Sequence, residues 1–317
     1  MDALAHLLDG PRARRAFLMR SIFTPPWSLR VEDRAPLTLL AQVEGEAWVV
    51  PDEAPAERLG PGDVAVLRGP GPYTVAADPG LPPRVVIHAG QRCTTPAGEP
   101  LGDAMRLGVR TWGDSLDGAT TMLTGTYQMR GEVSRRLLDV LPALAVLPAG
   151  ALGPPLVPLL RDEIVKDEPG QEAVLDRLLD LLLITVLRAW LSRPQAGVPS
   201  WYRAHADPVV GPVLRELHRE PARPWTVAAL AEHAGVSRAA LARRFTGLVG
   251  EPPMAYLTGW RLALAADLLR GTDATVAAVA RQVGYGGAFA LSVAFKRVHG
   301  VSPREYRRGP EPAGDDS

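Results

Sequence analysis

The sequence predicts an α+β protein with two domains, an amino-terminal antiparallel β-barrel followed by helices and a carboxyl-terminal all-α domain. The length of 317 residues is about twice that of a typical single core. Glycine and proline, 31 of each, lie mostly before residue 170 and separate short valine- and leucine-rich runs, as strands and turns do. The last hundred residues carry one helix-turn-helix pattern twice, which predicts the helical domain.

Charge and composition set the predicted domain boundaries. Residues 205–308 hold 14 Lys and Arg against 8 Asp and Glu, a net charge of +6, whereas residues 1–204 have a net charge of −3. A basic domain of this kind suits contact with phosphates. The predicted segments are a barrel with its helices, a Pro- and Gly-containing linker, the helical domain and a disordered tail, over residues 1–191, 192–204, 205–308 and 309–317 respectively.

Five short strands are predicted in the amino-terminal domain, at a spacing of roughly ten residues that fits a small antiparallel barrel. They cover residues 37–43, 47–50, 64–67, 74–77 and 84–89. Three helices are predicted after them, over residues 133–140, 155–165 and 173–191. The last helix is apolar nearly all round, so it must be covered on more than one side, either by its own barrel or by a second copy of the chain.

Each copy of the helix-turn-helix pattern has a turn glycine, Gly235 or Gly284, that can take a positive φ. Side-chain oxygens that can cap helix amides precede four predicted helices, at Thr226, Ser237, Thr275 and Ser302. The second helix of each copy is expected to bury one apolar face, made by Leu241, Phe245 and Leu248 or by Leu291, Phe295 and Val298. A helix over residues 254–269, about 24 Å long, could hold these second helices roughly one DNA turn apart.

The carboxyl-terminal motifs resemble those of the AraC family of transcription regulators. The resemblance runs without a gap through GVSR at 235–238, GEPPMAYL at 250–257, VGY at 283–285, AFKR at 294–297 and GVSP at 300–303. It implies a sequence-specific regulator that binds double-stranded DNA, forms a homodimer and can contact RNA polymerase.

Residues 1 to about 130 resemble the cupin-type sensor domain that AraC relatives often carry. The resemblance rests on the stretch LGPGDVAVLRGPGPY at 59–73, after VEGEAW at 43–48. Many cupins bind a metal through histidines, but the matching stretches hold Leu40, Ala41 and Tyr73, and the six histidines of the chain have no ligand spacing. No acid, base or nucleophile set converges, so we expect no metal, no cofactor and no catalytic residue.

The predicted DNA-contacting residues of the first copy are Thr226, Ser237, Arg238, Ala239, Ala242, Arg243 and Arg244. The family motif places Ala239, Ala242 and Arg243 at base-facing positions. Among the base-facing positions only Arg243 can make a bidentate contact, usually with guanine, and the alternative is a solvated surface arginine. Arg238 and Arg244 are expected to contact phosphates.

The corresponding positions of the second copy are unusual. They are Ala288, Phe289, Val293, Lys296 and Arg297. The first three carry no group that reads a hydrogen-bonding base edge, whereas the last two can hold phosphates. We expect this copy to anchor the protein more than it specifies a sequence. The alternative, that the preceding Gly-Gly pair makes the copy a poor DNA contact, stays open.

Aromatic and polar residues on the predicted strands are candidates to line a cavity. They are Gln42, Trp48, Tyr73, His88 and Trp112. A barrel without metal ligands fits a compact, largely apolar small molecule as effector. The alternative is that these side chains are ordinary core.

Cys93 is the single cysteine, and the resemblance makes it a candidate redox sensor. The neighbouring Arg92 would favour the thiolate. No second cysteine can resolve a sulfenic acid within the chain, so an inert side chain is the alternative. A single cysteine also excludes a disulfide framework.

A cytoplasmic, non-membrane protein is expected. Residues 1–10 lack the pattern of a signal peptide, and charged residues interrupt the helix over 173–191. The leading hypothesis is a transcription regulator that responds to a small molecule or a redox signal. Two alternatives stay open: an architectural DNA-binding protein that needs no metal, and a cupin enzyme fused to a DNA-binding domain.

Overall fold

The computed structural model forms two compact units. It describes residues 17–127, 132–133, 138–139, 141–153, 155–193 and 203–308. The sheet unit takes its described residues from 11–129 and 138–196, and the helical unit takes its described residues from 130–137 and 197–317.

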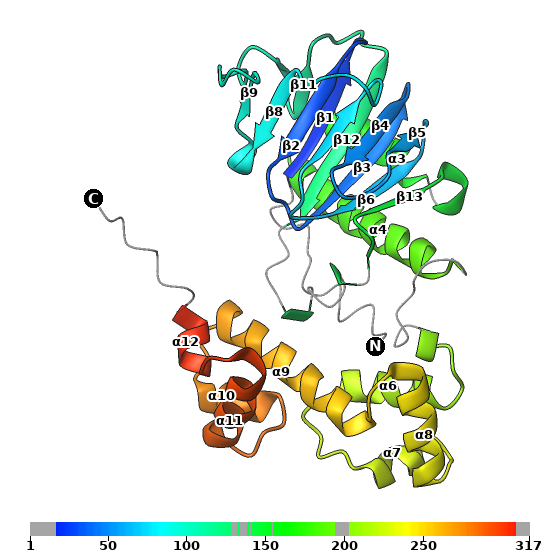
Figure 1. Ribbon diagram of the computed structural model, residues 1–317, viewed down its shortest axis with the longest axis vertical. Helices are drawn as coiled ribbons and strands as arrows, with labels where there is room; N and C mark the ends of the chain where they lie inside the picture. The colour runs from blue at the N-terminus through cyan, green and yellow to red at the C-terminus, as the bar shows by residue number, and fades with distance from the viewer. Residues whose placement is uncertain are drawn as a thin grey trace. The chain divides into compact units, whose positions relative to one another are not determined.

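In the described part of the chain, thirteen strands build the sheet unit as two sheets (Figure 1). The strands are β1 Phe17–Phe23, β2 Ser28–Glu32, β3 Leu37–Glu44, β4 Ala47–Pro51, β5 Glu57–Leu59, β6 Val64–Arg68, β7 Tyr73–Ala76, β8 Val85–His88, β9 Cys93–Thr94, β10 Arg106–Gly108, β11 Thr111–Gly113, β12 Thr120–Tyr127 and β13 Leu144–Leu147. One sheet has the order β10-β11-β1-β12-β3-β6-β13, and the other has the order β5-β4-β7-β2-β8-β9. The five predicted strands correspond to β3, β4, β6, β7 and β8.

Strand pairing differs from the predicted antiparallel barrel. β1 pairs with β11 in parallel and β2 pairs with β8 in parallel, so both sheets are mixed and the purely antiparallel prediction was wrong. Among the described strands no ladder joins the two sheets, so hydrogen bonding does not close a barrel. The parallel pairs join segments far apart in sequence, such as Arg20 with Thr111, and a local pattern of alternation carries no information about such pairing.

The core of the sheet unit lies between the two sheets. It receives side chains from both, including Leu29 and Val31 of β2, Leu40 of β3, Val49 of β4 and Met122 of β12. Successive residues of a strand point to opposite faces, so every second residue enters this core.

Two helices cover the seven-stranded sheet, α3 Leu156–Ile164 and α4 Gln171–Leu191 (Figure 1). α4 buries a stripe that includes Leu175, Leu179 and Leu183, and the Tyr127 hydroxyl donates a 2.9 Å hydrogen bond to the Leu179 carbonyl. Burial of α4 against its own sheet confirms one of the two predicted ways of covering it. The predicted helix over 133–140, the linker over 192–204 and the tail over 309–317 lie largely or wholly outside the described residues.

Seven helices form the described part of the helical unit. They are α6 Val210–Arg219, α7 Val227–His233, α8 Arg238–Val249, α9 Pro253–Gly271, α10 Val276–Gln282, α11 Ala288–His299 and α12 Pro303–Arg308. Figure 1 shows α9 as a long helix with α7 and α8 at one end and α10, α11 and α12 at the other. Its 19 residues span about 28 Å at about 1.5 Å per residue, slightly more than the predicted length.

Each end of α9 has its own core and its own tight turn. Leu241 and Phe245 are fully buried in the first core, and Leu291 and Phe295 in the second. The turn between α10 and α11 requires glycine, because Gly284 has φ 84° and a Cβ there would lie 2.7 Å from backbone atoms of Ala222. This packing confirms the predicted apolar faces except at Val298, which is 56% exposed.

All four predicted helix caps are present. The hydroxyls of Thr226, Ser237 and Thr275 accept hydrogen bonds of 3.1–3.2 Å from the third amide of the following helix. Ser302 and Glu305 form a reciprocal pair at the start of α12, with the Glu305 carboxylate accepting from the Ser302 amide at 2.7 Å and the Ser302 hydroxyl accepting from the Glu305 amide at 3.3 Å.

A short segment from the middle of the chain belongs to the helical unit. The carboxylate of Asp267 on α9 accepts hydrogen bonds from the amides of Glu132 and Val133 at 2.5 and 3.2 Å, and the Tyr306 hydroxyl donates to Glu132 at 2.9 Å. Burial raises the pKa of the Asp267 carboxyl. Residues 132 and 133 therefore group with the helices, although the sequence placed them in the amino-terminal domain.

Candidate functional sites

The exposed face of α8 carries most of the predicted polar contacts. Its core side is Leu241, Phe245 and Val249, which leaves Arg238 and Arg243 exposed on the rest of the helix. Of the predicted alanines, Ala239 is exposed and Ala242 is half-buried. The helix thus presents two unburied guanidinium groups separated by small side chains, a surface that a phosphate or a base edge can approach.

Arg244 differs from these two arginines because it has a partner within the unit. Its guanidinium makes hydrogen bonds of 2.8–3.1 Å to the carboxylate of Asp207. Asp207 also accepts hydrogen bonds from the amides of Val209 and Val210, both at 2.9 Å, at the start of α6. Arg244 therefore ties α8 to α6, a contact that the sequence did not reveal.

The exposed face of α11 is apolar. Phe289 is 84% exposed and Val293 is 57% exposed, while Ala288 is half-buried. Lys296 and Arg297 are exposed near the end of the same helix. α11 also starts at Gly287 without a side-chain cap, unlike α8, which starts at Ser237.

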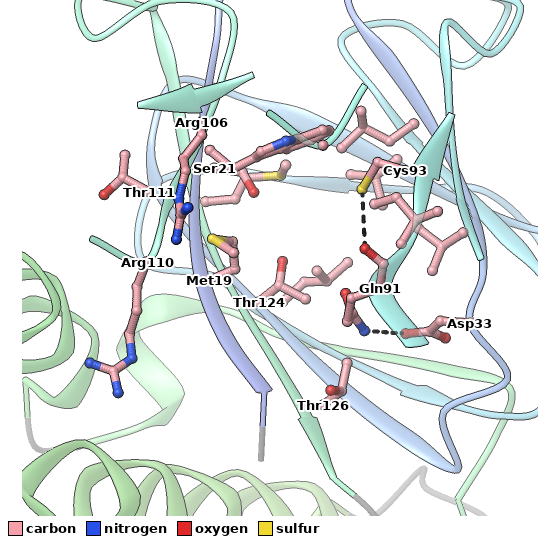
Figure 2. A pocket seen from close by; sticks show the side chains of 18 of the residues that line it. Met19, Ser21, Asp33, Gln91, Cys93, Arg106, Arg110, Thr111, Thr124 and Thr126 are labelled. Carbon is pink, nitrogen blue, oxygen red and sulfur yellow. Dashed lines mark hydrogen bonds between the residues drawn. The ribbon is translucent and has the colours of Figure 1, made fainter. Parts of the chain in front are cut away.

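A cavity of about 340 Å³ opens between the two sheets of the sheet unit. Met19 and Ser21 of β1 and Thr124 and Thr126 of β12 line it from one sheet, and Cys93 of β9 lines it from the other (Figure 2). Further lining residues are Leu29, Val31, Asp33, Leu40, Tyr73, Val75, Ile87, Gln91, Gly102, Asp103, Arg106, Gly108, Arg110, Thr111, Trp112 and Met122. The walls are mainly apolar, with serine and threonine hydroxyls on the seven-stranded sheet and charged groups at Asp33, Asp103, Arg106 and Arg110.

Of the five predicted cavity residues, Tyr73 and Trp112 line the cavity and the other three do not. Val49 is the residue of β4 that points into the core, so the neighbouring Trp48 faces the opposite side of its sheet. Gln42 is fully buried and donates to the Glu44 carbonyl at 2.7 Å, at the end of its own strand. The His88 ring contacts the Thr94 hydroxyl at 3.0 Å instead of the cavity.

Residues with unusual backbone conformation gather at this cavity. In the described residues, three positions other than glycine have a positive φ: Arg34 at 57°, Gln91 at 62° and Arg110 at 48°. Gln91 and Arg110 line the cavity, and Arg34 follows the lining residue Asp33. Such conformations cost free energy and concentrate at ligand-binding sites. Sequence patterns did not single out these positions, because a positive φ at Arg or Gln has no local signal.

Comparison with known proteins decides the family. Residues 2–192 match the cupin family and residues 230–309 match a helix-turn-helix domain family. A putative AraC-like transcription regulator of Streptomyces lividans is 37% identical over 98% of this chain and 99% of its own length. The chain belongs to the AraC-like transcription regulators.

Other relatives match shorter stretches. One from Streptomyces antibioticus is 42% identical over 60% of this chain and 64% of its own length. The regulator AlkR of Acinetobacter baylyi is 36% identical over 46% of this chain and 47% of its own length. The protein is accordingly a DNA-binding transcription regulator with a cupin amino-terminal domain, as the sequence predicted.

In this AraC-like regulator Cys93 sits in an environment that disfavours the thiolate. Burial raises the pKa of the Cys93 thiol, opposite to the effect expected from Arg92, whose side chain is exposed. The thiol donates to the Gln91 carbonyl at 3.6 Å. Within the described ranges no cluster of three or more His, Cys, Asp or Glu is placed to hold a metal ion, and no described helix is both long and apolar enough to cross a membrane.

Proposed function

We propose that this regulator binds a small-molecule effector in the cavity between its two sheets and adjusts transcription in response. The observation that carries the proposal is the cavity itself, about 340 Å³ in volume and walled by both sheets. A concave, largely apolar site with a few polar groups is the usual form of a small-molecule site. The positive φ values at Gln91 and Arg110 support this use of the cavity.

DNA contact is proposed through the helix-turn-helix pairs α7–α8 and α10–α11. Arg243 is the proposed base-reading residue, because it is exposed on α8 and makes no ion pair with a described residue. Arg238, Lys296 and Arg297 are proposed phosphate contacts. Thr226 and Ser237 serve as caps that fix the starts of α7 and α8, where helix amides can also face phosphates.

A homodimer formed through the helices of the sheet unit is proposed as the DNA-binding form. Val174 and Leu181 lie seven residues apart on one side of α4 and are 44% and 45% exposed. Two such side chains on a helix that buries most of its other leucines offer an apolar face to a second copy. A cytoplasmic location, a non-enzymatic role and contact with RNA polymerase complete the proposal.

The test is a protection experiment on the promoter beside the gene of this protein, with and without a library of small molecules. Thermal melting of the full chain runs in parallel. A compound that raises the melting temperature and changes promoter protection supports the proposal. Promoter protection that no compound changes, together with melting that no compound shifts, contradicts the effector role and favours the architectural alternative.

A further inference from the structure

An apolar stripe stands on the outside of α11. Phe289 is the most exposed large apolar side chain in the part of the chain that the structure describes, at 84%, and Val293 follows one turn later at 57%. A single exposed apolar residue is ordinary. Two residues at i and i+4 share one helix face and form a continuous apolar surface.

α8 and α11, with the helix that follows each, repeat with an offset of fifty residues, which shows what this stripe replaces. Leu241 and Leu291 correspond, as do the Phe245–Tyr256 and Phe295–Tyr306 edge-to-face ring pairs, with centroid distances of 5.8 and 5.2 Å. With the same offset Phe289 corresponds to Ala239, and Val293 corresponds to Arg243. α11 therefore carries apolar groups where α8 carries a small residue and an arginine.

We propose that α11 reads thymine methyl groups in the major groove through Phe289 and Val293, which rests on the proposed contact of α11 with DNA. The 5-methyl group of thymine is the apolar group that a base pair exposes in the major groove, and apolar side chains recognise it by contact. Residues four apart on a helix lie about 6 Å apart along its axis, close to two base-pair steps of about 3.4 Å each. The preferred half-site then holds thymines one or two steps apart.

Charge around the stripe favours DNA over a protein as its partner. Lys296 and Arg297 are exposed on the next turn of the same helix, and the helical unit from residue 205 to 308 has a net charge of +6. An apolar patch followed by cations matches a groove whose floor carries methyl groups and whose edges carry phosphates. At the start of α11, nothing lies within 4 Å of a Cβ built on Gly286 or Gly287, so the backbone there leaves room for close approach.

Removal of the methyl groups tests the proposal directly. The best site is first selected from random DNA with the full chain, and the α11 half-site is then synthesised with deoxyuridine in place of thymidine. We expect affinity to fall about fourfold for each contacted methyl that is lost. Phe289→Ala and Val293→Ala should each weaken binding to the thymidine site and remove the effect of deoxyuridine at one position. Both side chains are exposed, so melting temperature should stay unchanged.

The same experiment separates failure of this inference from failure of DNA binding by the protein. Deoxyuridine in the α8 half-site and the variant Arg243→Ala test the other half of the site. The change in affinity that each causes should be the same in the unmodified protein and in Phe289→Ala. Equal affinity for thymidine and deoxyuridine sites in the unmodified protein, with binding through α8 intact, overturns the inference alone. Dissociation of a dimer by Phe289→Glu without DNA present also overturns it and assigns the stripe to a second copy of the chain.

Discussion

Asp207 holds the guanidinium of Arg244 through hydrogen bonds at Nε and Nη2, the shortest 2.8 Å long. The same carboxylate accepts hydrogen bonds from two backbone amides at the start of α6. The side chain of Asp207 is only 13% exposed, whereas that of Arg244 is 49% exposed. One half-buried carboxylate therefore fixes the start of α6 and the orientation of an arginine on α8.

Loss of this carboxylate should destabilise the helical unit. Asp207→Ala removes both the ion pair and the cap of α6, so we expect the free energy of unfolding to fall by about 1 to 2 kcal/mol. Urea denaturation of the full chain measures it. Asp273→Ala is the matched control, because Asp273 is an exposed aspartate of the same unit, and its effect should stay within about 0.5 kcal/mol. Equal effects of the two variants would contradict the role given to Asp207.

The ion pair between Asp207 and Arg244 predicts that stability depends on pH. Hydrogen bonding to Arg244 is the largest cause that lowers the pKa of the Asp207 carboxyl below its ordinary value of 3.8. The stability that this carboxylate contributes is present above the unfolded-state pKa and is lost as the pH falls through the lower folded-state pKa. The free energy of unfolding of the unmodified chain should therefore fall below about pH 4, and Asp207→Asn should lack this fall. Identical pH profiles would argue against the ion pair.

Replacement of Arg238 and replacement of Arg244 should change the salt dependence of DNA affinity by different amounts, although the sequence predicted a phosphate contact for each. Arg244 is already engaged with Asp207, whereas Arg238 is exposed. Arg238→Ala should lower the slope of log affinity against log salt by about one, and Arg244→Ala should change it much less. Gel shifts across a salt series decide between them. A larger change for Arg244→Ala would mean that the pair with Asp207 opens on DNA.

Arg243 should determine one base of the site. Arg243→Ala is expected to lose about 1 to 3 kcal/mol on the best site and to relax preference at one position. Arg297→Ala should instead weaken all sequences alike. Selection of bound sequences from a random pool compares the two variants. If both lose equally on specific and random DNA, Arg243 does not read a base.

The helical unit followed closely from the sequence, because its signals are local. A cap, a turn glycine and an apolar stripe lie within about a dozen residues of one another, and Thr226, Gly235 and Leu241 were each placed as predicted. The exception was Arg244, whose partner Asp207 lies 37 residues away. Sequence spacing carries no sign of such a contact.

The cavity was predicted less well from the sequence, because its walls are built by strands that pair over long distances in the chain. β1 and β11 supply Ser21 and Trp112, and these strands pair in parallel across about ninety residues. An aromatic residue on a strand faces the core or the outside according to a register that shifts with a single residue. Tyr73 and Trp48 therefore looked alike in the sequence, but only Tyr73 lines the cavity.

The difference between Tyr73 and Trp48 provides the last test, which asks whether the cavity holds the effector. Thr124 lies on the cavity wall and Trp48 lies outside it, so Thr124→Trp should fill the site whereas Trp48→Phe should leave it open. Filling a packed core costs about 1 to 3 kcal/mol, so each variant is compared with itself, with and without a compound that raises the melting temperature of the unmodified chain. We expect Thr124→Trp to lose that rise and to keep its affinity for DNA, because the helical unit is unchanged. A rise that survives Thr124→Trp but disappears in Trp48→Phe would place the effector on the outer face of the six-stranded sheet.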